Sequence, residues 1–272
     1  MPRFEVDVSD RKPIGNTGET VSAVGLGTWA IRDYRGALRA YIEAFSLGID
    51  NVDTAEMYDD GKAERFVGEL ARIVGRDRIF ITTKLLPHRF RSRDSSLKAM
   101  KLSLERLGVS SVDLTLIHWP DTLAAIEDQA RNLEALVFEG LTRYIGVSNF
   151  TVEELETARQ ALRRYDIVVN QVKYSILDKS VEEELLQYAM LRGITIQAYT
   201  PLERGEVLAH KTVNEIARKR GKTPAQVALN YLISRPRVIA IPKAEKGEHV
   251  REIAGAMGWR LSPEDIEVLE TT

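Results

Sequence analysis

The sequence contains no cysteine, which excludes disulfide bonds, thiolate metal sites and cysteine nucleophiles. Chains without disulfides are typical of the reducing cytoplasm, where we expect this protein to reside. Long apolar runs are missing as well, since no stretch approaches the roughly 18 consecutive apolar residues of a membrane helix. Residues 1–7 alternate charged and apolar side chains instead of forming a signal-peptide core. We therefore expect no membrane partner.

A large excess of one charge is also missing. The 38 basic and 40 acidic residues give a net charge of −2, and no long basic run occurs, so nucleic acid is not an expected partner. A hydrophobic fraction of 44% and a charged fraction of 29% describe a globular chain with a large core. Linkers rich in proline or serine and repeats of fixed period are absent. We expect one domain, residues 1–272, that acts on a small molecule as a monomer.

Short β-branched runs alternate with longer amphipathic segments along almost the whole chain. This alternation is typical of a parallel α/β sheet. It predicts eight strands, at Ala23–Thr28, Ile49–Thr54, Ile79–Leu85, Val112–His118, Tyr144–Ser148, Ile167–Val172, Thr195–Ala198 and Val238–Ile241. It also predicts helices at Ala63–Val74, Leu97–Leu107, Leu123–Phe138, Val152–Arg164, Val181–Leu191, Val213–Lys219, Pro224–Ile233 and Pro263–Leu269.

Residues typical of helix ends support these boundaries. Asp94, Thr151 and Thr223 stand at expected N-cap positions, and glycines follow four helices, at Gly75, Gly108, Gly140 and Gly193.

Eight strands fit either a doubly wound sheet or a barrel. The doubly wound sheet would normally carry G-x-G-x-x-G after its first strand, but here Gly25-Leu26-Gly27 is followed by Thr28-Trp29-Ala30. We therefore predict a (β/α)8 TIM barrel, whose catalytic groups lie at the carboxyl ends of the strands. Phe4–Val8 and the residues up to Ile14 predict a β-hairpin that closes the bottom of the barrel, followed by turn residues Asn16, Thr17 and Gly18.

Reactive side chains stand at the ends of three successive predicted strands. Asp53 closes the second strand, Tyr58 follows in the loop, Lys84 lies near the end of the third and His118 ends the fourth. Burying an ammonium group is unfavourable unless an acid pairs with it, and Asp53 can be the partner of Lys84. Each residue alone has an ordinary explanation: a helix cap, a loop aromatic, a lysine that reaches solvent and a core histidine. Their joint placement favours a catalytic site.

This set of residues suits the reduction of a carbonyl group. A carbonyl that accepts hydride becomes an alkoxide, so it needs a proton donor and a second polar group that fixes its oxygen. Tyr58 and His118 fit these two needs. We expect Lys84, paired with Asp53, to lower the pKa of Tyr58 from about 10 towards neutrality.

Motifs along nearly the whole chain resemble those of the aldo-keto reductase superfamily in order and spacing. They are Gly25-Leu26-Gly27-Thr28-Trp29, Asp53-Thr54-Ala55-x-x-Tyr58, Thr83-Lys84, Leu116-Ile117-His118-Trp119-Pro120, Ile145-Gly146-Val147-Ser148-Asn149-Phe150, Asn170-Gln171 and Ile241-Pro242-Lys243. Segments 170–175, 198–203 and 255–262 further resemble the short archaeal alcohol dehydrogenases of that superfamily.

The resemblance implies a catalytic tetrad and a metal-independent reaction. Tyr58 would be the acid, Lys84 and Asp53 would tune it, and His118 would orient the carbonyl. Steroid double-bond reductases of the superfamily carry glutamate at the histidine position, so His118 favours carbonyl reduction. The implied activity is reversible hydride transfer between NADP or NAD and aldehydes, ketones or alcohols.

The same resemblance implies the nicotinamide site. Ser148, Asn149 and Gln171 would hold the nicotinamide amide, and Tyr199 would stack on its ring. The alternative readings are a helix cap for Ser148-Asn149 and simple packing for Tyr199. Backbone N–H groups near Pro201 and Leu202 would face the pyrophosphate. The other implied cofactor contacts are Thr28, Trp29, Ile241, Lys243, Ala244, Glu245, His249 and Glu252.

The adenosine end departs from the family. Lys243 can pair with a 2′-phosphate and Glu252 matches, but Ala244, His249 and Ile253 replace the usual serine, arginine and asparagine. Glu245 places a negative charge close to the expected phosphate and should oppose its binding. We expect NADP to bind less tightly than in typical members and NAD to be accepted or preferred. The alternative reading is that Glu245 only caps or solvates the next helix.

Three apolar side chains are expected to line an open substrate wall: Trp29, Met57 and Trp119. Burial in the core is the alternative reading of the two tryptophans. No metal site is expected, because the four histidines lack the spacing of zinc ligands.

Two other functions fit part of the sequence. One is a regulatory protein that senses redox state through a bound dinucleotide with little turnover. The other is a lyase or isomerase barrel, which would carry a phosphate site after strands seven and eight. Lys243 could resemble such a site, but intrinsic phosphate loops there are usually rich in glycine.

Overall fold

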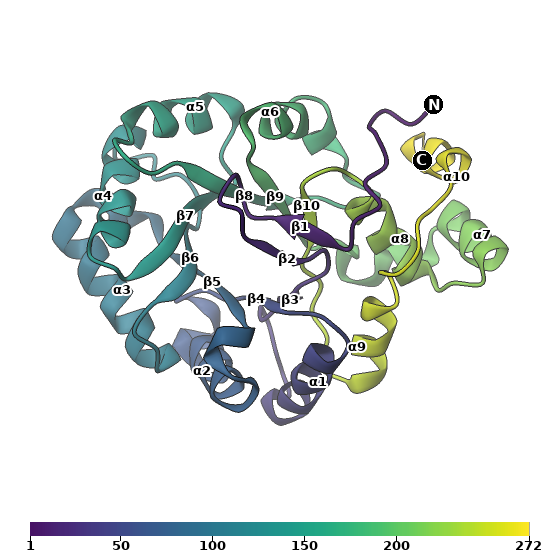
Figure 1. Ribbon diagram of the computed structural model, residues 1–272, viewed down its shortest axis with the longest axis horizontal. Coiled ribbons are helices and arrows are strands. Elements are labelled where there is room, and N and C mark those ends of the chain that lie inside the picture. Colours follow the sequence, from purple (N-terminus) through teal and green to yellow (C-terminus); the bar gives the residue numbers. More distant parts are fainter. Residues whose placement is uncertain (272) are drawn as a thin grey trace.

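The computed structural model describes residues 1–271 as a barrel of parallel strands surrounded by helices (Figure 1). Thr272, the last residue of the expected domain, lies outside the described residues. The strands follow one another around the sheet in chain order: β3 (Leu26–Gly27), β4 (Asn51–Asp53), β5 (Phe80–Leu85), β6 (Val112–Ile117), β7 (Thr142–Ser148), β8 (Ile167–Lys173), β9 (Thr195–Tyr199) and β10 (Val238–Ala240). A parallel bridge between Val24 and Ala240 joins the first strand to the last, and the Gly25 amide donates to the Ala240 carbonyl at 2.8 Å. The eight predicted strands and the predicted barrel are therefore confirmed.

Ten helices of the described chain flank this barrel: α1 (Tyr34–Ser46), α2 (Lys62–Val74), α3 (Arg93–Leu107), α4 (Ile126–Phe138), α5 (Val152–Ala161), α6 (Leu185–Arg192), α7 (Lys211–Arg220), α8 (Pro224–Ile233), α9 (Gly247–Ala254) and α10 (Pro263–Glu270). Thr151 and Thr223 cap α5 and α8 through complete capping boxes, as expected. The prediction of Asp94 as the N-cap of α3 is wrong. The side chain of Ser92 accepts from the Ser95 amide, so Ser92 is the N-cap and α3 begins at Arg93. None of the helices described is long and apolar enough to cross a membrane.

A short hairpin lies across one end of the barrel (Figure 1). Its strands are β1 (Arg11–Pro13) and β2 (Thr20–Ser22), so the expected turn residues 16–18 lie between them. The prediction that Phe4–Val8 belongs to the hairpin is wrong. Phe4 instead packs into the main core. The Asp7 amide donates to the Ser234 carbonyl at 2.9 Å, so this segment bonds to the end of α8 and not to the hairpin.

The inside of the barrel is packed with side chains. Ile14 and Val21 from the hairpin region share one buried cluster with strand residues that include Phe80, Leu114 and Val168. A second and larger cluster fills the space between the strands and the helices. Because the hairpin end is plugged by this packing, the open end is the one where the strands terminate.

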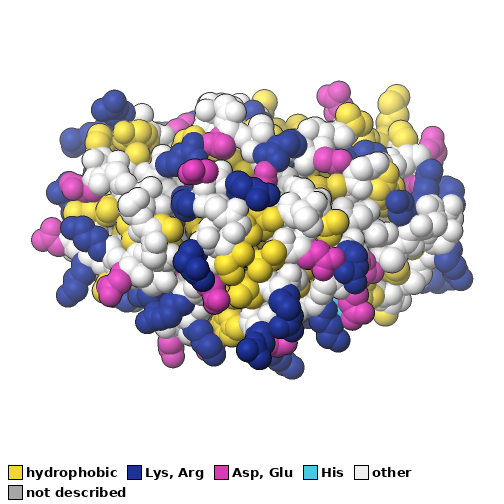
Figure 2. Space-filling model, turned by 60° about the horizontal axis from the view of Figure 1, so that its bottom comes forward, with side chains coloured by type: hydrophobic (Ala, Val, Ile, Leu, Met, Phe, Trp, Pro, Cys, Tyr) yellow, Lys and Arg dark blue, Asp and Glu magenta, His cyan; other side chains and the backbone are white. Residues whose placement is uncertain are grey.

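Acidic and basic side chains are interspersed over the molecular face in Figure 2, as expected from their similar numbers in the sequence.

Candidate functional site

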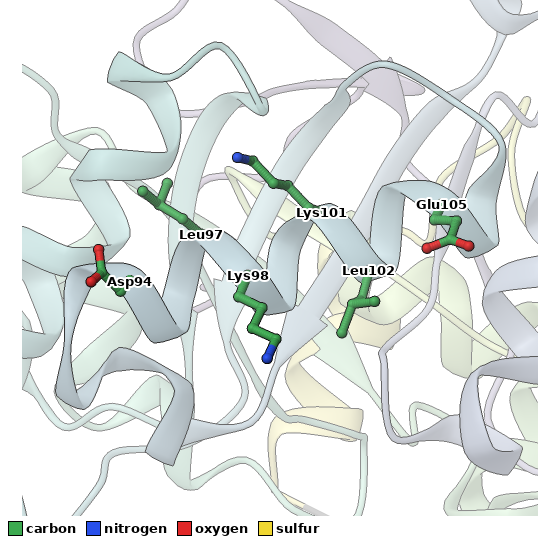
Figure 3. Close-up of a pocket in the computed structure, with 6 residues that line it drawn as sticks. All are labelled: Asp94, Leu97, Lys98, Lys101, Leu102 and Glu105. Carbon is green, nitrogen blue, oxygen red and sulfur yellow. The ribbon is translucent and has the colours of Figure 1, made fainter.

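A surface hollow lies along α3 and is lined only by residues of that helix (Figure 3). Its lining residues are Asp94, Leu97, Lys98, Lys101, Leu102 and Glu105. None of the predicted site residues is among them. The candidate site lies instead at the carboxyl ends of the barrel strands.

Three of the four expected tetrad residues form one hydrogen-bonded group. The Lys84 ammonium lies 2.6 Å from a carboxylate oxygen of Asp53 and 3.0 Å from the hydroxyl of Tyr58. It also donates to the Thr54 carbonyl at 3.1 Å. Lys84 is only 1% exposed, which makes the reading of a lysine that reaches solvent wrong.

The register of the strands explains how this group forms. Asp53 at the end of β4 pairs with Thr82 of β5, so Lys84, two residues further along, points to the same face of the sheet. The chain then turns at residues 58–61 into a short 3-10 helix that begins with Tyr58. The short loop after β4 thus places the phenol of Tyr58 beside the ends of β4 and β5.

The charges of this group are coupled. Burial lowers the pKa of Lys84, but the Asp53 carboxylate and the Tyr58 hydroxyl raise it. The net result is a pKa above the ordinary value. Burial raises the pKa of Tyr58 above its ordinary value, Lys84 lowers it and Asp53 raises it, so the net change is upwards. The expectation of a Tyr58 pKa shifted towards neutrality is therefore wrong for the protein alone, because desolvation and the carboxylate outweigh the ammonium.

His118 follows β6 and lies against the phenol. The two rings meet edge to face with centroids 5.7 Å apart. Burial, together with the nearby Lys84 ammonium, lowers the pKa of His118 to about 3, so the imidazole is neutral. Its buried Nδ1 makes no hydrogen bond with any part of the chain that the structure describes. This nitrogen is a polar atom that a ligand could satisfy.

The four expected nicotinamide residues meet at the ends of β7, β8 and β9. The Tyr199 hydroxyl donates to the Asn149 amide oxygen at 2.9 Å, the Asn149 amide donates to the Ser148 hydroxyl at 3.1 Å, and that hydroxyl donates to the Gln171 carbonyl at 2.8 Å. The side chain of Gln171 donates to Asp53 at 2.7 Å. One network therefore joins these residues to the tetrad.

The alternative reading of Ser148 and Asn149 as a helix cap is wrong, because Thr151 caps α5. Sequence reasoning missed one member of the network. Gln197 in β9 is buried and accepts from the Gln171 side chain at 3.0 Å. Its signal was a long polar residue inside an otherwise apolar strand.

The loop after β9 contains Pro201 and Leu202 and continues into a 3-10 segment, Glu203–Ala209. Arg204 was not predicted, yet its guanidinium carbon lies 5.2 Å from the ring centre of Trp29. The contact joins this loop to the one after β3, where Thr28 is buried and donates to the Asp53 carbonyl at 3.0 Å. Both expected pyrophosphate residues thus lie in a loop that reaches across to the β3 loop.

The expected adenosine residues follow β10. Ile241 and Ala244 are buried there, whereas His249 and Glu252 lie on α9. Lys243 donates to a Glu245 carboxylate oxygen at 2.6 Å. The Glu245 side chain makes no cap for α9, whose N-cap is Lys246, so the reading of Glu245 as a helix cap is wrong.

The three residues of the expected substrate wall are exposed. Trp29 is 53% exposed, Met57 45% and Trp119 39%, so the core reading of the two tryptophans is wrong. Trp119 also lies beside His118, with the two ring centroids 4.8 Å apart. Large exposed apolar side chains of this kind often mark binding surfaces. Among the described residues, no group of three or more histidine, aspartate or glutamate side chains could hold a metal ion.

Known proteins resemble this chain over most of its length. The model of the aldo/keto reductase family matches residues 23–271. Methylglyoxal reductase YeaE of Escherichia coli is 34% identical over 263 residues, covering 92% of this chain and 90% of the relative. Glyoxal reductase of Bacillus subtilis is 33% identical over 248 residues, covering 90% and 87%.

Solved structures agree with this relationship. An aldo/keto reductase of Klebsiella pneumoniae in complex with NADP and acetate superposes with a TM-score of 0.88 at 32% identity, covering 97% of this chain and 95% of that chain. A thermostable aldo-keto reductase in complex with the inhibitor epalrestat gives a TM-score of 0.90 at 38% identity, covering 96% and 98%. The chain belongs to the aldo/keto reductase family.

Proposed function

We propose that the protein catalyses reversible hydride transfer between NAD(P)H and the carbonyl group of an aldehyde or ketone. One observation carries the proposal: a phenol hydroxyl lies 3.0 Å from a buried ammonium, which lies 2.6 Å from a carboxylate. The family relationship supports the same reaction.

The residues around the tetrad fit a nicotinamide. The amide and hydroxyl groups of Ser148, Asn149 and Gln171 provide both donors and acceptors, which a carboxamide requires. Tyr199 presents an aromatic ring at the same strand ends. When bound, the reduced nicotinamide supplies the hydride.

The protein's own groups handle the proton. Tyr58 donates its phenolic proton to the carbonyl oxygen while hydride reaches the carbonyl carbon, so that one O–H and one C–H bond form as the carbonyl π bond breaks. Lys84 stabilises the phenolate that remains, and Asp53 keeps Lys84 charged. His118 is neutral and fixes the carbonyl oxygen by a hydrogen bond.

We propose small 2-oxoaldehydes as substrates. The names of two relatives, methylglyoxal reductase and glyoxal reductase, support this class. The exposed side chains of Trp29, Met57 and Trp119 leave the apolar wall open, which suits substrates of varied shape.

We propose that both NADP and NAD serve as cofactors. A related structure contains NADP, and Lys243 is the cation of this chain that would pair with a 2′-phosphate. Several expectations from the sequence remain predictions. They are the resemblance to archaeal alcohol dehydrogenases, the single domain, the monomeric state, the cytoplasmic location and the absence of nucleic-acid and membrane partners.

The variant Tyr58→Phe tests the function. We expect it to lower kcat for methylglyoxal reduction by about a hundredfold or more, because the proton donor is lost. NADPH affinity, measured by fluorescence titration, should stay within about twofold of the wild type because Tyr58 donates no bond to the proposed cofactor residues.

Near-normal turnover by the variant would refute Tyr58 as the acid. Single-turnover oxidation of bound NADPH by methylglyoxal separates an enzyme from a redox sensor, which would show little reaction.

A further inference from the structure

The expected phosphate-binding lysine is engaged by a carboxylate of the same chain. Lys243 donates to one carboxylate oxygen of Glu245 at 2.6 Å and to the Ala30 carbonyl at 2.9 Å. The other carboxylate oxygen accepts from the backbone amides of Arg32 at 3.1 Å and Asp33 at 2.8 Å. We call these four contacts the Glu245 clasp. It joins the loop after β10 to the loop after β3.

The clasp gives a carboxylate the contacts that a phosphate oxygen would also use. An ammonium group and backbone N–H groups are common ligands of phosphate. The side chain of Glu245 is 19% exposed, so the two loops cover this anion in part. Burial raises the pKa of Glu245, but Lys243 and the two backbone amides lower it, and the net pKa lies below the ordinary value. The carboxylate is therefore charged near neutral pH.

A second cation of this segment faces a carboxylate as well. Arg251 on α9 pairs with Glu43 of α1 at 2.5 Å. A 2′-phosphate that arrives beside Lys243 therefore meets a cation that already has an acidic neighbour, Glu245.

We propose that Glu245 sets the discrimination between NADH and NADPH, because its carboxylate must leave Lys243 before a 2′-phosphate can bind there. A ribose with a free 2′-hydroxyl leaves the Lys243–Glu245 pair intact. A carboxylate can also accept a hydrogen bond from such a hydroxyl, as acidic residues do in other dinucleotide sites. The inference rests on the proposed function only in requiring that a nicotinamide dinucleotide binds.

Binding measurements test the inference without turnover. Calorimetric titrations would use NADH, NADPH, adenosine 5′-monophosphate and adenosine 2′,5′-bisphosphate as probes. In Glu245→Gln the carbonyl oxygen can still accept from Arg32 and Asp33, but the charge beside Lys243 is gone. We expect the affinity for both 2′-phosphorylated probes to rise roughly tenfold relative to their unphosphorylated partners.

Glu248→Gln is the matched control. It makes the same change of charge three residues away, at a side chain that is 65% exposed. We expect it to change the NADPH to NADH affinity ratio by less than about twofold, because exposed charges are screened. Equal effects of the two variants would overturn the inference in favour of net charge alone.

A double-mutant cycle identifies the mechanism. If Glu245 holds Lys243 away from the phosphate, Lys243→Met should weaken NADPH binding only slightly in the wild type but roughly tenfold in the Glu245→Gln background. Equal losses in both backgrounds would overturn the displacement step. Thermal melting checks that each variant is folded.

Failure of the inference and failure of the proposed function give different results. If neither NADH nor NADPH binds to the wild type, the proposed function fails. If both bind and Glu245→Gln leaves their affinity ratio unchanged, only the inference about Glu245 fails.

Discussion

The side-chain amide of Gln171 donates a 2.7 Å hydrogen bond to Asp53, whose other carboxylate oxygen lies 2.6 Å from Lys84. A residue proposed to hold the nicotinamide amide therefore also supports the tetrad. The carboxylate is almost fully buried, so its oxygens need such donors as hydrogen-bond partners.

Gln171→Leu should affect binding and chemistry together. The variant removes one donor from Asp53 and one proposed contact to the cofactor, so we expect kcat to fall roughly tenfold and the NADPH Kd to rise roughly tenfold. Steady-state kinetics and fluorescence titration measure the two effects. Gln197→Leu is the comparison, because it removes only the acceptor of the second Gln171 bond and leaves the Asp53 contact in place. Equal losses in the two variants would argue against the Asp53 contact as the cause.

The raised pKa of Tyr58 predicts opposite pH profiles for the two reaction directions. A phenol whose pKa lies above its ordinary value stays protonated at neutral pH, so kcat for reduction should be flat between about pH 6 and 9. Alcohol oxidation needs the phenolate and should become faster as pH rises. Stopped-flow rates of hydride transfer in both directions measure the profiles. A reduction rate that declines from pH 6 upwards would show that Tyr58 loses its proton near neutrality.

The depressed pKa of His118 predicts a loss of stability in acid. The folded protein keeps His118 neutral down to about pH 3, whereas the unfolded chain takes up the proton near pH 6.5. The unfolded state therefore binds more protons between these values, and the contribution of His118 to the free energy of unfolding decreases as pH falls through this window.

Replacing this histidine should flatten the pH dependence. In His118→Gln we expect the slope of the unfolding free energy between about pH 6 and 4 to decrease by up to about 1.4 kcal/mol per pH unit. Urea unfolding at a series of pH values measures it. Identical slopes would mean that His118 is solvated enough to take up its proton in the folded state.

A buried ionic network should make Glu182 important for stability. Arg235 is 0% exposed and reaches Glu182 at 3.2 Å, and the hydroxyls of Tyr174 and Tyr231 donate to the same carboxylate. Glu182→Ala removes the shared acceptor, and we expect it to lower the free energy of unfolding by about 3–5 kcal/mol. Urea unfolding measures the change. Its neighbour provides the control, since Glu183→Ala at an exposed position should change stability by about 0.5 kcal/mol or less.

The positions of the tetrad could be predicted because parallel strands place their carboxyl ends together. Asp53, Lys84 and His118 could each be assigned to a strand end from local patterns, and the barrel then brings them to one site. The helix caps at Thr151 and Thr223 were predictable for a similar reason, since a capping box involves residues only three apart.

Features that depend on distant residues were not predictable from local patterns. The hairpin was misplaced because Phe4 packs against Arg235, a contact across most of the chain. The pKa of Tyr58 depends on a balance between burial and two opposite charges, which residue types alone do not determine. The contacts of Glu245 with Arg32 and Asp33 likewise join residues more than 200 positions apart.

The barrel is closed between two of its shortest strands. β3 has two residues and β10 three, and between them lies the bridge from Val24 to Ala240. Short ladders open locally at low free energy, so amide hydrogens at this junction should exchange with solvent sooner than those of β5 to β8. Both loops of the Glu245 clasp leave from these two strands. A dinucleotide bound there would stabilise the closed junction, and hydrogen exchange at Gly25 and Gly27 would then report occupancy of a site whose chemistry takes place at Tyr58.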